Sequence, residues 1–388
     1  MQGTCVVMAA ALSLCGAATG ETPAVSANAS GVRYESATYE CQAGHRVEKR
    51  SATLDSGTTH YTFGYSGCVD PSHGDRRPSA EGNFGMPAPT AANWYWGGFL
   101  RVLINDIDAV GYRVEDWRVI ETGARGTLQI VFAHPDAELG LRLVMMPGGN
   151  HVLADMRWSP RAGATIRSVT VELRCYPSFF TAARNRNGDR HCGTPRTDGP
   201  QDQTLQLVPG ADTYLYYYDT VFDPAKGEGD GPCAALVAPD GLTGGEVMVG
   251  SYAVITTLSY LPEAGAARLA LYDFTGSTNA AADEYLKAHG ADDLAELVAL
   301  DSRPLTVRNL DVEKLREDAE RLLSGAGEDG QPYQDRVRDL LARATALKAE
   351  VDAGDWRAEA DLGAEIEASA DLFWKLRAFA VLNDQPRA

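Results

Sequence analysis

The stretch NWYWGGF, residues 93–99, concentrates aromatic rings and is a first candidate for a ligand-binding surface. In a strand, Trp94 and Trp96 would point to one face and Tyr95 to the other. A flat indole ring suits the apolar C–H face of a pyranose, and its N–H can serve a sugar hydroxyl. The stretch therefore predicts either an aromatic platform for a sugar or, as the alternative, rings that fill the core.

A second aromatic stretch, TYLYYYD at residues 213–219, has the same ambiguity. Strand alternation places Tyr214, Tyr216 and Tyr218 on one face. Three phenols in a row prefer a wet or half-wet surface, because each O–H needs a polar partner. These tyrosines therefore favour a polar binding groove, with core packing as the alternative.

Two loops carry clusters of basic residues although the formal net charge of the chain is −18. Their candidate ligand-binding residues are Arg76, Arg77, Arg184, Arg186, Arg190 and His191. Guanidinium groups match carboxylate, sulfate or phosphate groups bidentately, so an acidic sugar is a coherent ligand. The alternative is that these arginines pair with surplus surface carboxylates.

Acid–base chemistry at a uronate would need a base beside the reacting proton and a cation for the developing charge. The candidates for such roles are His191, Tyr216 and Glu172. No GxSxG, P-loop, GxGxxG or HExxH motif is present, so serine-nucleophile, nucleotide and zinc-protease functions have no support.

One acidic loop, FDPAKGEGDGPC, has residues that could bind calcium. Asp223, Glu228 and Asp230 supply carboxylate oxygens in a glycine-rich stretch. Their spacing fits no EF-hand, and a solvated turn is the alternative interpretation. No other cofactor or metal is expected.

The cysteines after the N-terminal stretch are scattered and form no CxxC pair, so no zinc site is expected. In an oxidising compartment we expect the disulfides Cys41–Cys68 and Cys175–Cys192, each closing a local loop, with Cys233 left over. The alternative is that all five are ordinary small buried residues.

The N-terminal residues 1–20 resemble a signal peptide, because an apolar run precedes a small-residue cleavage region and is too short to span a bilayer. We expect a secreted or periplasmic protein, with lipidation at Cys15 as an alternative. The excess of Asp and Glu, 53 against 35 Lys and Arg, repels polyanions and disfavours nucleic acid and anionic membranes as partners.

The organisation that must position these residues is mainly β. After a linker at residues 21–31, residues 32–307 show short runs with period-two alternation separated by turn residues. In TLQIVFA, for example, Leu128, Ile130 and Phe132 share one face, and a PGGN turn at residues 147–150 follows the next run. This pattern predicts a large antiparallel two-layer β-sandwich whose strands each bury one face.

The C-terminal region, residues 308–388, changes to helical periodicity. Helices are expected from Asp311, from Pro332 and after Asp355, which suits a helix N-cap. We expect a helical hairpin or three-helix unit that packs on itself or on the sandwich. A docking surface for a protein partner is the alternative.

The segment from Gly126 to Phe180 resembles the β-supersandwiches of the galactose mutarotase-like superfamily. The resemblance lies in the order strand, PGGN turn, strand, SVTVELRCYPSFF, and in the domain length. It implies a supersandwich over residues 32–307 whose concave face binds carbohydrate. The surroundings of that family's catalytic histidine and glutamate have no match here, so no catalytic residue is transferred.

The sequence therefore predicts an exported carbohydrate-binding protein without demonstrable catalysis. A carbohydrate-active enzyme, either epimerase-like or lyase-like, is the second hypothesis. An extracellular or envelope scaffold that uses the helical region for protein contacts is the third.

Overall fold

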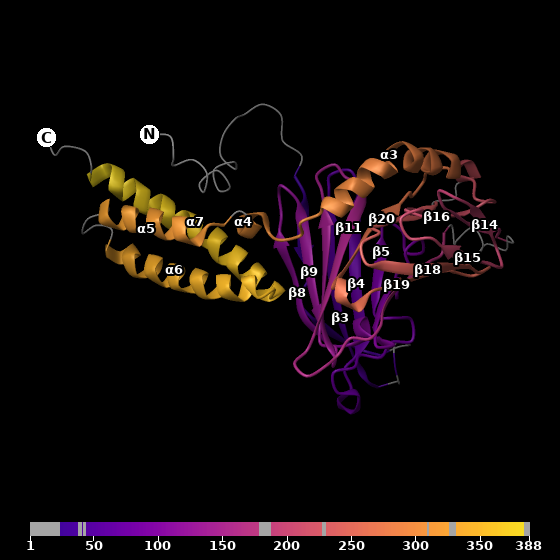
Figure 1. The fold of residues 1–388 in the computed structure, drawn as a ribbon, viewed down its shortest axis with the longest axis horizontal. Helices are drawn as coiled ribbons and strands as arrows, with labels where there is room; N and C mark the ends of the chain where they lie inside the picture. The colour runs from indigo at the N-terminus through magenta and orange to yellow at the C-terminus, as the bar shows by residue number, and fades with distance from the viewer. Residues whose placement is uncertain are drawn as a thin grey trace. The chain divides into compact units, whose positions relative to one another are not determined.

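The protein contains a β unit, Pro23–Ser302, and a helical unit within Arg303–Ala388. A computed structural model describes residues 24–37, 41, 44–177, 188–226, 230–308, 310–325 and 331–383 (Figure 1). The predicted signal peptide and Cys15 lie outside the described residues. No helix among the described residues is long and apolar enough to cross a membrane.

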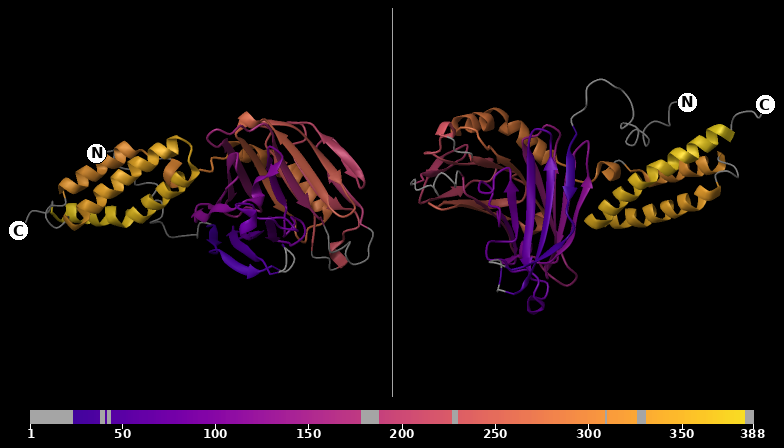
Figure 2. Two further views of the ribbon diagram at one scale, coloured as in Figure 1. Left: turned by 90° about the horizontal axis from the view of Figure 1, so that it is seen from below. Right: turned by 180° about the vertical axis from the view of Figure 1, so that it is seen from behind.

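Two antiparallel sheets build the β unit (Figure 2). The eleven strands of the first sheet are β1 (Ser26–Ala29), β2 (Arg33–Ser36), β3 (Arg46–Asp55), β4 (His60–Cys68), β5 (Phe84–Ala88), β6 (Leu100–Ile104), β7 (Ile107–Asp108), β12 (Val169–Cys175), β15 (Gln203–Leu207), β18 (Leu242–Val249) and β19 (Val254–Tyr260). The nine strands of the second are, in spatial order, β14 (Asp198–Pro200), β13 (Arg190–Gly193), β16 (Tyr214–Asp219), β17 (Cys233–Val237), β20 (Ala266–Asp273), β11 (His151–Pro160), β10 (Ala137–Met145), β9 (Gly126–Phe132) and β8 (Val114–Glu121).

Alternation places one side of each sheet in a shared core. Leu128, Ile130 and Phe132 of β9 are fully buried and belong to the same core cluster as Val171 of β12 in the other sheet. The PGGN turn joins β10 and β11, with Val144 opposite Leu153 in the register. The predicted two-layer sandwich, with its mainly β fold class, is therefore confirmed.

The outer face of the second sheet is also covered, which corrects the expectation of a single buried face. Helix α3 (Asn279–Ala299) packs Leu286 and Leu297 against Val144 and Leu153, which point away from the inter-sheet core. Polar residues of this face are buried too: Arg142 donates to Gln129 Oε1 and to the carbonyl oxygen of Ser302. The helix thus adds a third layer here, and the buried Arg142 finds its acceptors on β9 and in the segment that follows α3.

Three details of local structure differ from the sequence expectations. Residues 26–29 of the predicted linker form β1, which pairs with β3 in the first sheet, and Val25 forms an isolated bridge with Gly123. The stretch NWYWGGF is a series of turns between β5 and β6 and not a strand. Gly85 allows this path, because a Cβ atom there would lie 1.6 Å from the carbonyl oxygen of Trp96. The β unit ends at Ser302, five residues before the predicted boundary at 307.

The helical unit contains the three expected helices, α5 (Val312–Gly325), α6 (Gln331–Asp352) and α7 (Trp356–Asn383). A short helix that was not expected, α4 (Leu305–Arg308), precedes them. Asp355 caps α7, with Oδ1 accepting from the backbone N–H groups of Arg357 and Ala358. A small core joins Val307, Ala344 and Leu362. The predicted docking role of this unit stays a prediction.

Candidate functional site

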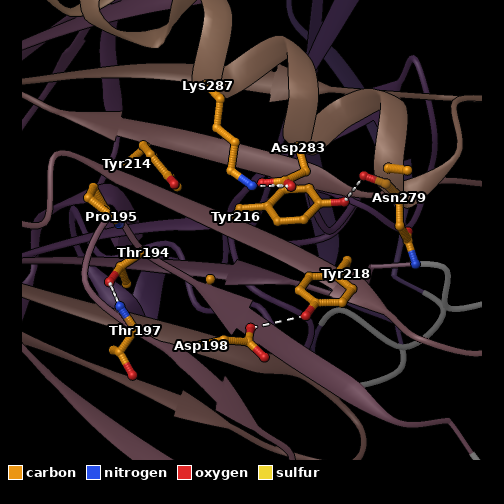
Figure 3. A pocket seen from close by; sticks show the side chains of 12 residues that line it. Thr194, Pro195, Thr197, Asp198, Tyr214, Tyr216, Tyr218, Asn279, Asp283 and Lys287 are labelled. Atoms are coloured by element: carbon orange, nitrogen blue, oxygen red, sulfur yellow. Dashed lines mark hydrogen bonds and ion pairs between the residues drawn. The ribbon is translucent and has the colours of Figure 1, made fainter.

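A pocket of about 520 Å³ lies on the outer face of the second sheet, beside the first turns of α3 (Figure 3). Residues on strands β13, β14 and β16 and in the turn between β13 and β14 form one wall of the pocket, and residues of α3 form the other. Its lining residues are Gly193, Thr194, Pro195, Thr197, Asp198, Tyr214, Tyr216, Tyr218, Asn279, Ala280, Asp283 and Lys287. All three tyrosines that alternation grouped on one face are among them.

Strand alternation in β16 separates core residues from pocket residues. Leu215 and Tyr217 point into the inter-sheet core and are fully buried, and the Tyr217 hydroxyl lies 2.7 Å from Thr256 Oγ1. Tyr214, Tyr216 and Tyr218 therefore point to the opposite face, where α3 leaves part of the sheet uncovered.

The tyrosine rings form a stacked surface at the base of the pocket. The ring centroids of Tyr216 and Tyr218 are 4.8 Å apart with an interplanar angle of 16°. Tyr216 is 4% exposed and its hydroxyl donates to the carbonyl oxygen of Asn279 at 2.8 Å, so this ring forms the floor. Tyr214 and Tyr218 are only half-buried and offer the accessible aromatic surface.

Polar groups surround these rings from both walls. The Tyr218 hydroxyl donates to Asp198 Oδ1 at 3.0 Å, and Lys287 Nζ lies 2.6 Å from Asp283 Oδ2 on the helix wall. Asn279 ties the start of α3 to the end of β16, because its Nδ2 donates to the carbonyl oxygen of Asp219 at 2.8 Å. The pocket thus combines apolar ring surface with carboxylate, amide and ammonium groups, as Figure 3 shows.

His191 supports the strand wall from behind Asp198. Its Nδ1 lies 2.7 Å from Asp198 Oδ2 and its Nε2 lies 3.5 Å from Asp189 Oδ1, so both ring nitrogens face carboxylates. Its ring also packs 5.3 Å from that of Tyr218. His191 therefore orients Asp198 and Tyr218 but does not itself line the pocket.

Burial controls the protonation of the pocket phenols. Desolvation, followed by the nearby Asp283 carboxylate, raises the pKa of Tyr216 far above its ordinary value. Desolvation and Asp198 do the same to the pKa of Tyr218. Both phenols are neutral at physiological pH, so they are hydrogen-bonding groups and poor bases.

The tryptophan candidates lie elsewhere. Trp94 is 0% exposed, its Nε1 donates to the carbonyl oxygen of Tyr272 at 2.8 Å, and its ring packs edge-on against Tyr217. Trp94 is therefore a core residue, which corrects its placement on a ligand platform. Trp96 is 42% exposed but does not line the pocket. The two do not share a strand face, because this segment is not a strand.

The described arginine candidates are also outside the pocket. Arg76 is exposed and forms an isolated β-bridge with Tyr112. Arg77 Nη1 donates to the carbonyl oxygen of Gly74, and its Nε lies 3.8 Å from Glu48 Oε2. Arg190 is 1% exposed and donates to the carbonyl oxygen of Ser251. Arg184 and Arg186 lie outside the described residues.

The remaining candidates do not converge on the pocket either. Glu172 lies in β12 of the other sheet, where its carboxylate pairs with Arg101 and Arg174. Asp223 pairs with Lys226 at 3.1 Å, and Glu228 lies outside the described residues. The two described side-chain clusters that could hold a metal include neither Asp223 nor Asp230. The pocket therefore contains only part of the predicted site.

The expected disulfides are not formed. Cys68, Cys175 and Cys192 are buried thiols, which excludes Cys41–Cys68 and Cys175–Cys192 bridges in this structure. The Cys175 thiol instead donates to the carbonyl oxygen of Val254 at 3.8 Å and the Cys233 thiol to that of Asn93 at 3.7 Å. Burial raises the pKa of the Cys233 thiol well above its usual value. Cys175, Cys192 and Cys233 all lie in the inter-sheet core as free thiols.

The helix wall of the pocket was not recognised from the sequence. The Ala-rich residues 279–300 are typical of a helix, but their pattern does not indicate which strands that helix covers. Asn279, Asp283 and Lys287 were therefore not candidates. Asp198 follows the basic stretch directly, and its position two strands from Tyr218 depends on sheet order. The only usable signal was the pairing of Asp283 with Lys287 at i,i+4, which is common on solvated helices.

Neither a protein-family model nor a curated protein sequence matches this chain. Similar solved structures include an α-galactosidase from Lactobacillus brevis, with a TM-score of 0.33 and 12% identity over 58% of this chain and 40% of that chain. They also include an α-N-acetylgalactosaminidase from Bifidobacterium bifidum, with a TM-score of 0.37 and 12% identity over 63% of this chain and 38% of that one.

A putative aldose 1-epimerase from Klebsiella pneumoniae is similar with a TM-score of 0.37 and 8% identity, over 72% of this chain and 97% of that chain. A protein of the epimerase class that the strand order resembles is therefore among the similar structures. The chain spans well under half the length of the α-galactosidase. Identities and TM-scores this low assign neither a substrate nor an activity to it.

Proposed function

We propose that this protein binds carbohydrate in the pocket between β16 and α3, and that the ligand is a neutral sugar residue. The stacked pair Tyr216–Tyr218, flanked by Asp198 and Asp283, carries the proposal. Half-buried phenol rings pack against sugar C–H groups, and carboxylates accept hydrogen bonds from hydroxyls. The volume of about 520 Å³ lies within the range of small-ligand pockets.

The charges at the pocket support a neutral ligand over the acidic sugar expected from the sequence. Asp198 and Asp283 both line the pocket, whereas its cation, Lys287, already pairs with Asp283. The described arginines among the candidates do not line it. Among the described residues, an anionic sugar would therefore face carboxylates without a guanidinium partner.

Binding without catalysis is the function that this geometry supports. The neutral phenols are poor bases, and both nitrogens of His191 face carboxylates on the strand wall. Glu172, the third acid–base candidate, lies in the other sheet. An epimerase-like or lyase-like reaction stays the alternative, and it would require a different base.

The test is isothermal titration of the full chain with neutral, uronate and sulfated oligosaccharides, followed by variants. Binding of a neutral sugar that Tyr218→Ala and Asp283→Asn each weaken about tenfold or more would support the proposal. Tyr34→Ala and Asp335→Asn are the matched controls, since both side chains are exposed elsewhere. Binding of uronates alone would contradict the neutral ligand, and no binding of any sugar would contradict carbohydrate recognition.

A further inference from the structure

A cluster of sulfur and imidazole ligands lies apart from the pocket, where β2, β3 and β4 end. Cys41, His45 and Cys68 each place one ligand atom within 4.8 Å of the other two. Cys41 and His45 belong to the connection from β2 to β3, and Cys68 is the last residue of β4. No zinc site was expected from the sequence because no CxxC pair exists, but this cluster draws its thiols from two separate segments.

Strand pairing brings the two segments together. Val47 of β3 lies opposite Cys68 of β4, and the backbone N–H of Val69 donates to the carbonyl oxygen of Arg46 at 3.0 Å. The pairing therefore continues past the strand ends and sets His45 beside Asp70. The Ala37 N–H donates to the carbonyl oxygen of His45 at 2.8 Å and closes the connection that carries Cys41.

The separation between Cys68 and His45 suits tetrahedral metal coordination. Cys68 Sγ lies 3.5 Å from His45 Nδ1. Two ligand atoms at about 2.3 Å (S) and about 2.05 Å (N) from a zinc ion, seen at a tetrahedral angle, are about 3.6 Å apart. Without a metal this contact is a hydrogen bond between a thiol and an imidazole, and the same separation fits the edge of a zinc tetrahedron.

Asp70 supplies the outer partner that metal-binding histidines use. His45 Nε2, on the opposite side of the ring from the thiols, lies 3.6 Å from Asp70 Oδ2. The other oxygen of Asp70 accepts from the Ser72 N–H at 2.9 Å and caps the turn η1 (Pro71–His73), which holds the carboxylate in place. A carboxylate facing the remote nitrogen fixes the tautomer that leaves Nδ1 available as a ligand.

We propose that Cys41, His45 and Cys68 bind one zinc ion, with Asp70 as a positioning residue for His45. Two thiolates and one imidazole are the ligand chemistry of zinc, and the burial of Cys68 disfavours hard, hydrated cations such as calcium. Binding releases the two thiol protons to solvent and leaves the metal in its divalent state. The ion would join the β2–β3 connection to the end of β4, the same two segments that the expected Cys41–Cys68 disulfide would have linked.

The test is titration of the reduced full-length protein with Co²⁺ and then Zn²⁺, after purification without immobilised metal. We expect thiolate-to-cobalt absorption with tetrahedral d–d bands, saturating at about one equivalent and abolished by zinc. The zinc content of the protein as purified should also approach about one equivalent per chain.

Variants distinguish this site from adventitious metal binding. Cys41→Ser and His45→Ala should remove the cobalt bands, and Asp70→Asn should weaken zinc binding about 10- to 100-fold. Cys41 and His45 are not fully buried, so circular dichroism can confirm that these variants fold. Cys233→Ser is the control and should keep the bands, since this thiol lies in the inter-sheet core. Absence of thiolate bands in the reduced wild type, or their retention in Cys41→Ser, would overturn the proposal.

Discussion

Residues 93–99 and 213–219 are both crowded with aromatic rings, and the same two interpretations applied to each. The first stretch forms turns whose Trp94 ring closes the inter-sheet core, where it contacts Tyr217 of the second stretch. The second stretch is a regular strand that divides its rings between the core and a pocket. Aromatic content alone therefore does not indicate which rings reach a pocket, whereas strand regularity does, because alternation must present one set of rings to the outer face.

The largest expected effect is a difference in the free energy of unfolding between the alanine variants of Trp94 and Trp96. Trp94→Ala should lower the free energy of unfolding by about 3–5 kcal/mol, because it empties a fully buried site and removes a donor from the Tyr272 carbonyl. Trp96→Ala should change it by less than about 1 kcal/mol. Urea unfolding of both variants is the measurement. Equal destabilisation would show that the two rings share one environment.

The turn path of residues 93–99 should depend on Gly85. A Cβ atom there would lie 1.6 Å from the Trp96 carbonyl oxygen, which is backbone and cannot rotate away. Gly85→Ala should therefore cost about 1–3 kcal/mol or more of unfolding free energy. Gly64, its partner in the β4–β5 register, is the matched control, since a Cβ atom there would meet nothing closer than 4.0 Å. If Gly64→Ala cost as much in the same urea experiment, the close approach would not be the cause.

Substitutions on the two faces of β16 should affect different properties, with the core face affecting stability and the pocket face affecting sugar binding. Tyr217→Phe removes a buried hydroxyl 2.7 Å from Thr256 Oγ1 and should lower the unfolding free energy by about 1–2 kcal/mol, with little effect on sugar affinity. Tyr218→Phe should do the reverse, because its hydroxyl holds Asp198 at the pocket rim. Unfolding and calorimetric titration of both variants test this. A sugar-affinity loss confined to Tyr217→Phe would place the ligand elsewhere.

The smallest expected effect is a pH dependence of the free energy of unfolding that arises from His151. This histidine packs beside Tyr272, whose carbonyl oxygen accepts the hydrogen bond of Trp94. Burial lowers the pKa of His151, against an opposing effect of Asp293, and its ring lies 4.7 Å from Tyr272. In the unfolded chain His151 takes up a proton below about pH 6.5, whereas in the folded chain it does so only at lower pH. The free energy of unfolding therefore falls as the pH drops from about 6.5 toward the lowered pKa of the folded chain. His151→Gln should reduce this loss by about 1 kcal/mol between pH 7 and 5, as measured by urea unfolding.

The exposed His60 provides the control for that pH dependence. His60→Gln should leave the pH profile of unfolding unchanged. A profile that His151→Gln also leaves unchanged would assign the acid sensitivity to other groups, of which the buried His134, with its pKa likewise lowered by burial, is the first to examine.

Much of the fold could be predicted because its signals are local. Period-two runs around Leu128 and Val171 predicted buried strand faces, and Asp355 predicted the start of α7. The tyrosines of β16 were grouped correctly for the same reason. The cysteine pairs failed because spacing along the chain does not determine how thiols meet in a folded sheet: Cys175, Cys192 and Cys233 are free thiols within the inter-sheet core.

The sequence by itself determined the class of elements and which residues share a face, since side-chain direction follows from backbone period. Only the tertiary structure decided which face meets which neighbour. Helix α3 converts the outer face of β16 into a pocket wall, and the pairing of β3 with β4 brings His45 to Cys68. Such contacts depend on strand order and layer packing, which the order of residues along one segment does not encode.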